Sequence, residues 1–115
     1  MSRSQVDYLR HILDECIFIL GAIKNKTKEE FLPDEMLIRA VVRSIEVIGE
    51  ATKNLSHEFR SSFPQVEWKK LAATRDVMIH NYFGLDLFIV WEIVSEKIPG
   101  LEKEIRKIIL EIENP

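Results

Sequence analysis

The stretch PDEMLIRAVVRSIEVIGEATKNL, residues 33–55, decides how this chain folds. Pro33-Asp34 is typical of a helix start, and apolar residues then recur on a broad helical face as far as Leu55. Val41-Val42 and Val47-Ile48 place apolar side chains on more than one stripe of this helix. A helix that buries two faces needs two packing partners, one of which could be a second subunit.

Helical periodicity continues on both sides of this stretch. Apolar positions spaced three and four residues apart predict four further helices, over residues 4–24, 67–82, 86–94 and 101–112. Asp86 is expected to cap the fourth helix, and breaks are expected at Ser61–Pro64 and at Pro99-Gly100. No clean alternating run flanked by hairpin turns competes with this pattern. We therefore predict an all-α fold, a small antiparallel bundle of about five helices in a single domain spanning residues 1–115.

Composition limits the size of the core and the class of partner. The chain has 115 residues, of which 46% are hydrophobic, so we expect a small core that would gain from dimerisation. The formal net charge of −3 argues against a general nucleic-acid coat protein, which depends on many cations to neutralise phosphates. It does not exclude an enzyme with a local basic patch, to which Lys69, Lys70 and Arg75 could contribute.

The cellular compartment is predicted from three further features. The one cysteine, Cys16, lies in an apolar run and is expected to be a core thiol, which fits a reducing compartment. Met1-Ser2-Arg3-Ser4 leads into an amphipathic segment without a signal peptide, and no uncharged run approaches the ~20 residues of a membrane span. We therefore expect a cytoplasmic protein that has no contact with a membrane.

The stretch RDVMIHNY, residues 75–82, carries the chemistry. Arg75 can hold a phosphate through charge-assisted hydrogen bonds, and His80 is suited to move protons near neutral pH. Tyr82 adds a phenol, and random shuffling would produce this Arg, His and Tyr spacing only ~0.003 times per chain. The three histidines and one cysteine show no metal-ligand spacing, so we expect neither a metal nor another cofactor.

Helix geometry restricts how these residues can cooperate. Arg75 and His80 are five residues apart, so they point about 140° away from each other and lie ~7.5 Å apart along the helix axis. The site therefore needs the long reach of arginine, a local distortion or a second subunit, and we favour the second subunit. Asp76 and His80 share a face, so Asp76 could either pair with Arg75 or orient His80 in a supporting role.

A purely structural interpretation competes with the catalytic one. Arg75 could pair with Glu46 or Glu50 to tie two helices together. His80 could be a hydrogen-bonded core histidine, and Tyr82 a packing ring whose hydroxyl reaches the surface. The remaining histidines, at positions 11 and 57, are expected at the surface.

The motif and its surroundings resemble one family. The chain looks like a HepT-type toxin of the HEPN ribonuclease group from the 33–55 helix to its C-terminus, and the N-terminal helix matches by pattern alone. The segments that carry the resemblance are Arg39-Ala40, Ile45 to Ala51, Phe63 to Trp68, Arg75 to Tyr82, Phe83 to Asp86, and Val90-Trp91.

The resemblance implies an HEPN-like homodimer and a metal-independent endoribonuclease. In that interpretation the chain is the toxin of a type VII-like toxin–antitoxin system, and Arg75 and His80 cleave RNA at a dimer cleft. The implied partner is a minimal nucleotidyltransferase antitoxin of the MntA type, which adenylylates Tyr82. Two other interpretations stay open: a non-catalytic accessory subunit of such a nucleotidyltransferase, and a purely structural helical dimer.

Overall fold

The computed structural model describes the backbone of residues 3–80, 84 and 86–115. It describes the side chains of residues 5–78, 84 and 86–115. All regular structure in these ranges is helical, which confirms the predicted all-α class. The elements in chain order are α1 (Arg3–Ile23), α2 (Lys28–Phe31), α3 (Glu35–Asn54), α4 (His57–Ser62), α5 (Trp68–His80), α6 (Leu87–Glu92), η2 (Ile93–Lys97) and α7 (Ile98–Glu113).

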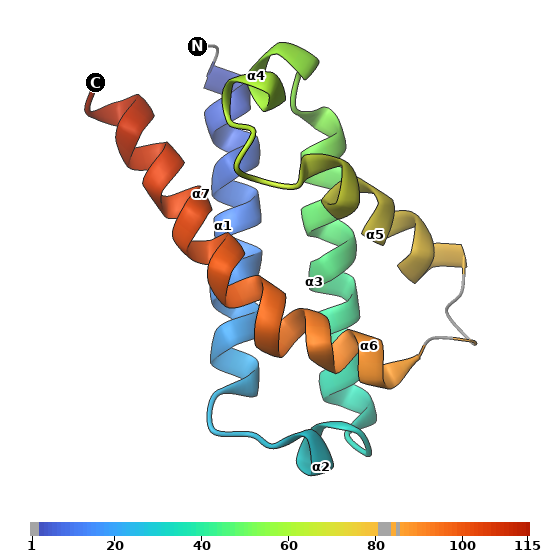
Figure 1. Ribbon diagram of the computed structural model, residues 1–115. Coiled ribbons are helices and arrows are strands. Elements are labelled where there is room, and N and C mark those ends of the chain that lie inside the picture. Colours follow the sequence, from blue (N-terminus) through green and yellow to red (C-terminus); the bar gives the residue numbers. More distant parts are fainter. Residues whose placement is uncertain (1–2, 81–83, 85) are drawn as a thin grey trace.

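Helix α3 is the centre of the fold. It runs antiparallel to α1 on one side and packs against α5 on the other (Figure 1). The two partners predicted from its two apolar faces are therefore both present within one chain. Its core-facing residues include Val41, Ile45 and Ile48, each at most 3% exposed. The apolar character of this helix thus needs no second subunit to explain it.

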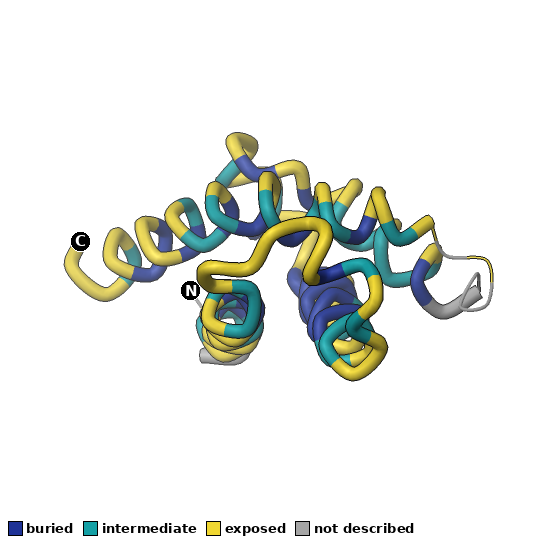
Figure 2. The backbone as a smooth tube through the Cα atoms, turned by 90° about the horizontal axis from the view of Figure 1, so that it is seen from below, coloured by how far each residue is buried: buried dark blue, intermediate teal, exposed yellow. Residues whose placement is uncertain are grey.

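The second layer lies across the α1–α3 pair. Helix α7 and the η2 turn before it pack on α1, and α5 packs on α3. Seen along α1 and α3, buried residues lie where these helices face the layer formed by α5 and α7 (Figure 2). Cys16 is fully buried in α1, as predicted, and burial is the main cause that raises the pKa of its thiol to about 12.

Helix starts follow the side chains that can cap them. Asp34 accepts a hydrogen bond from the Leu37 amide, and Asp86 accepts from the Phe88 and Ile89 amides, so both expected starts are confirmed. Thr27 and Glu30 form a reciprocal capping box at α2, a short helix that the apolar periodicity did not predict. Helix α4 is a second short helix absent from the prediction, because neither is long enough to show a repeating pattern.

The predicted break at Pro99-Gly100 is wrong. Helix α7 begins at Ile98 and runs through Pro99 to Glu113, directly after η2. Within η2 the turn is wider than an α-turn, and the Ile98 amide donates to the Ile93 carbonyl five residues earlier. Pro99 follows as one of the first residues of α7, where its missing N–H costs little. The chain therefore stays helical through a proline that would disrupt a regular α-helix.

Two buried residues anchor the start of α5. Val66 and Trp68 are buried, and the Trp68 indole N–H donates to the Phe63 carbonyl at 2.8 Å. The rings of Phe59 and Trp68 lie 6.2 Å apart, so α4 packs on the same anchor. None of the described helices combines the length and the apolar character that a membrane crossing requires.

Gly49 lets α3 and α5 approach each other closely. A Cβ atom at this position would overlap the Cβ of Arg75 and would lie 3.1 Å from both the Arg75 backbone nitrogen and the Leu71 carbonyl oxygen. Most of these neighbours are backbone atoms, which cannot rotate away. The absence of a side chain at Gly49 therefore sets the spacing between the two helices at the residue that begins the motif.

We predict that Gly49→Ala destabilises the protein by about 1–3 kcal/mol, because the new methyl group must push α5 away from α3. Gly21→Ala is the matched control, since a Cβ on this exposed helical glycine would meet no atom within 4 Å. That control should be neutral or stabilising by up to about 1 kcal/mol. Urea unfolding measures both, and equal free energies of unfolding for the two variants would contradict the close approach.

Candidate functional site

Arg75 lies in the middle of α5 with its backbone against Gly49. Its side chain is 32% exposed, and its Nε lies 2.9 Å from a carboxylate oxygen of Glu50 on α3. Of the two partners considered from the sequence, Glu50 is the one that pairs, whereas Glu46 lies 3.3 Å from Arg43 on its own helix. The guanidinium is thus held at the surface of the α3–α5 pair, where an anionic ligand can reach it.

Asp76 connects Arg75 to a second cation. One of its carboxylate oxygens accepts a hydrogen bond from Nζ of Lys53 at 2.7 Å and lies 3.3 Å from an Nη atom of Arg75. These contacts hold the pKa of Asp76 below its usual range, and the hydrogen bond from Lys53 has the largest effect. The expectation that Asp76 could pair with Arg75 is therefore confirmed. Glu50, Arg75, Asp76 and Lys53 form one continuous chain of charges between α3 and α5.

The other motif residues are less completely described. His80 is the last residue of α5, and its side chain lies outside the described residues. Tyr82 lies wholly outside them. Helix α5 remains an α-helix from Trp68 to His80, so no local distortion of the backbone turns His80 toward Arg75. Two of the three ways to bring Arg75 and His80 into one site therefore remain: the long side chain of Arg75 and a second subunit.

A groove beside Arg75 lies between α1 and α5 over the surface of α3. It has a volume of about 370 Å³. Arg75 contributes to one wall, and Tyr8 and His11 of α1 contribute to the opposite wall. Six residues of α3 line the rest: Arg43, Glu46, Val47, Glu50, Ala51 and Asn54.

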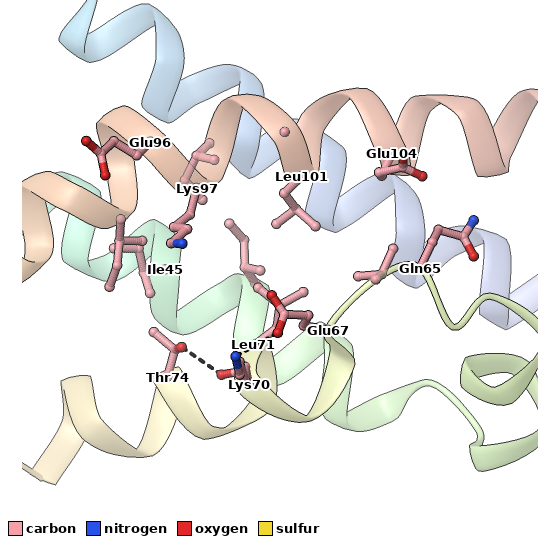
Figure 3. A pocket seen from close by; sticks show the side chains of 15 residues that line it. Ile45, Gln65, Glu67, Lys70, Leu71, Thr74, Glu96, Lys97, Leu101 and Glu104 are labelled. Carbon is pink, nitrogen blue, oxygen red and sulfur yellow. Dashed lines mark hydrogen bonds and ion pairs between the residues drawn. The ribbon is translucent and has the colours of Figure 1, made fainter.

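A separate cavity of about 530 Å³ lies between α5 and the η2–α7 segment. Leu71 and Leu101 extend into it from α5 and α7, and Ile45 of α3 contributes to its lining (Figure 3). Arg75 does not line this cavity, whereas Lys70 does and is paired with Glu67 at 2.7 Å. Lys70 and Arg75 therefore lie on different sides of α5 and do not form the single basic patch that the sequence suggested.

Several residues that shape this site were not predicted from the sequence. Gly49 was detectable, since a glycine inside a helix often marks a close approach of two backbones. Lys53 was also detectable, because it follows Glu50 by three residues and so shares its face of α3. His11 and His57 are exposed as expected, but only the fold brings His11 into the groove that Arg75 lines. Among the described side chains, no group of three histidine, cysteine or carboxylate residues could hold a metal ion.

Comparisons with known proteins agree on one family. The family described as "Ribonuclease HepT-like" matches residues 12–108. The chain is 48% identical over 102 residues to "Putative RNase TTE0752" of Caldanaerobacter subterraneus, covering 89% of this chain and 91% of that protein. It is 38% identical over 108 residues to "Probable ribonuclease HepT" of Thermococcus cleftensis, covering 94% and 98%.

A longer relative is similar to this chain over part of its length. "Gamma-glutamylcyclotransferase and putative RNase MJ0434" of Methanocaldococcus jannaschii is 45% identical over 106 residues. These residues cover 92% of this chain but 48% of that protein, so the chain spans about half of that relative. No solved structure matches the chain.

We predict that Lys53→Gln raises the pKa of Asp76, because the hydrogen bond from Lys53 is the largest cause of its lowered pKa. A carboxylate whose pKa is lowered by folding stabilises the fold at neutral pH, and this contribution is lost as the pH falls through the lowered pKa. Carbon-detected NMR titration of Asp76 measures the shift. Lys69→Gln is the control, since Lys69 is exposed on the same helix as Asp76. An unchanged Asp76 titration in Lys53→Gln would refute the charge chain.

Proposed function

This chain belongs to the HepT-like ribonuclease family, and we propose that it is a metal-independent endoribonuclease whose reaction centre is the Arg75–Tyr82 segment. The observation that carries the proposal is the position of Arg75. Its guanidinium is held by Glu50 at the wall of an open groove, and it begins the motif through which the chain resembles ribonuclease toxins.

The reaction would use the 2′-hydroxyl of RNA as the nucleophile. A base removes the proton from this hydroxyl, the oxygen attacks the adjacent phosphorus, and the bond to the 5′-oxygen breaks while an acid protonates that oxygen. The products are a 2′,3′-cyclic phosphate and a 5′-hydroxyl. Arg75 would stabilise the charge that builds on the phosphate oxygens, and His80 would transfer one of the two protons.

The two proton transfers favour a dimeric site. A single histidine cannot easily act as base and acid in one step, and a symmetric dimer would bring two copies of Arg75 and His80 to one cleft. The regular backbone of α5 supports this arrangement, because positions 75 and 80 of one regular helix lie about 140° apart around its axis. The proposal of a homodimer rests on the need to complete the reaction centre. It does not rest on the packing of α3, because α3 finds both packing partners within its own chain.

We also propose that the ribonuclease is the toxin of a type VII-like toxin–antitoxin pair in the cytoplasm. Its partner would be a minimal nucleotidyltransferase that transfers adenylate from ATP to the hydroxyl of Tyr82 and releases pyrophosphate. Tyr82 follows His80 by two residues, so the added nucleotide would lie close to the reaction centre. Its phosphate would compete with RNA for Arg75, and its bulk would block the cleft.

We predict that Arg75→Ala and His80→Ala each reduce RNA cleavage by at least about a hundredfold, in the range expected when a charge-stabilising or proton-transfer group is lost. Arg75→Ala keeps the Cβ that packs on Gly49, so the variant should remain folded. Cleavage of single-stranded RNA by purified protein is the measurement, and it should persist in EDTA. Arg106→Ala and His57→Ala are the controls, because both residues are exposed on other helices.

The same variants test the dimer. Wild type refolded with an excess of a double variant that combines both substitutions should lose activity per wild-type subunit if one cleft needs both copies of Arg75 and His80, whereas independent monomeric sites would keep it. Wild-type cleavage by either single variant would refute the assigned site. A stable complex with the nucleotidyltransferase without any RNA cleavage would instead favour the accessory-subunit interpretation.

We predict that Tyr82→Phe stays folded and active but escapes neutralisation, because the ring is kept and only the hydroxyl that accepts adenylate is lost. Mass spectrometry of the toxin co-expressed with its partner should find adenylate on the peptide that contains Tyr82. The other tyrosine, Tyr8, supplies the matched control: Tyr8→Phe should be modified and neutralised like the wild type. Adenylate on another residue, or on none, would overturn this mode of control.

A further inference from the structure

The groove next to Arg75 has features that the cleavage chemistry does not use. Its α1 wall carries two aromatic side chains, Tyr8 and His11, whose ring centroids lie 6.5 Å apart in an edge-to-face arrangement. Val47 and Ala51 add apolar surface on α3 between this wall and Arg75. The volume of about 370 Å³ lies at the lower end of the range for small-ligand sites, a size that suits one nucleotide better than a long strand.

We propose that this groove is a nucleotide subsite, in which the Tyr8 wall stacks against the base next to the phosphate held by Arg75. The inference rests on the proposed ribonuclease function and adds to it a site for the substrate's base. It places the RNA across α3, with the phosphate at the α5 wall and the base at the α1 wall.

The charges in the groove favour a base over a run of phosphates. Arg43 is paired with Glu46 at 3.3 Å, and Arg75 is paired with Glu50 at 2.9 Å. The four charges cancel, so the groove offers no net attraction for several phosphates. A neutral aromatic base does not need such attraction, and single-stranded RNA is commonly bound by stacking of its unpaired bases on aromatic side chains.

The side chains of the groove are held in place before a ligand binds. Tyr8 is half-buried and packs against the hydrophobic core, so its ring loses little freedom when a base stacks on it. The Asn54 side-chain amide donates to the Glu50 carbonyl at 2.9 Å. Its side-chain oxygen is then the end that can accept a hydrogen bond from the edge of a base.

The test compares two hexamers that differ only in their bases. One is 2′-O-methyl hexaadenylate, which cannot be cleaved because its nucleophile is blocked, and the other has the same 2′-O-methyl sugar–phosphate chain with hydrogen in place of each base. Fluorescence anisotropy measures the Kd of each hexamer. Wild-type protein should prefer the adenylate hexamer by about tenfold or more. Tyr8→Leu, which keeps apolar bulk against the core, should lose most of this preference, and Tyr8→Phe should keep it.

The binding measurements test the nucleotide subsite independently of RNA cleavage. An equal preference for adenylate in wild type and Tyr8→Leu would overturn the subsite, and so would its loss in Tyr8→Phe. A change in sedimentation of Tyr8→Leu with unaltered RNA binding would overturn it too, and would identify the groove as an interface between copies of the chain. Cleavage of unmodified hexaadenylate is measured in parallel. No cleavage together with a Tyr8-dependent preference would refute the ribonuclease while retaining the subsite.

Discussion

The close approach of α3 and α5 at Gly49 is the constraint on which the rest of the site depends. A side chain at this position would overlap the Cβ of Arg75, so the two helices pack at this distance only because none is present. The approach brings Glu50 within 2.9 Å of the Arg75 guanidinium. It also brings Lys53, one turn further along α3, within 2.7 Å of Asp76. This close approach thus positions both of these ion pairs between the two helices.

These ion pairs orient the motif more than they stabilise the fold. Glu50 is 56% exposed and Asp76 is 47% exposed, and ion pairs this accessible to water contribute little to stability because water screens their charges. Stability comes instead from the buried apolar residues of α1, α3 and α7 and from the Trp68 anchor at the start of α5. The charge chain can therefore yield to an anionic ligand at Arg75 without unfolding the bundle. Glu50 would compete with a phosphate for the Arg75 guanidinium, so the phosphate would have to displace Glu50 or bind beside it.

Helix α5 separates two surfaces of different character. On one side, Arg75 lines a groove whose charges are paired and whose far wall is aromatic. On the other side, Lys70 and Leu71 line a mainly apolar cavity toward α7 (Figure 3). The η2 turn helps to position the α7 wall of this cavity, because it keeps the chain helical from α6 into α7. Because Arg75 lies on the groove side of α5, we propose that RNA binds there and not at the mainly apolar cavity.

The sequence by itself determined the helical class, the caps at Asp34 and Asp86, the burial of Cys16 and the family resemblance through the 75–82 motif. Each of these depends on local spacing or on the hydrophobicity of a short segment. Only the tertiary structure decided that Glu50 pairs with Arg75, that Lys53 holds Asp76, and that α3 buries both faces within its own chain. It also decided that the chain stays helical through Pro99 and that His11 shares a groove with Arg75. Periodicity fixes which residues share a face, whereas the distance and angle between helices fix which faces meet, and these follow from packing across the whole core.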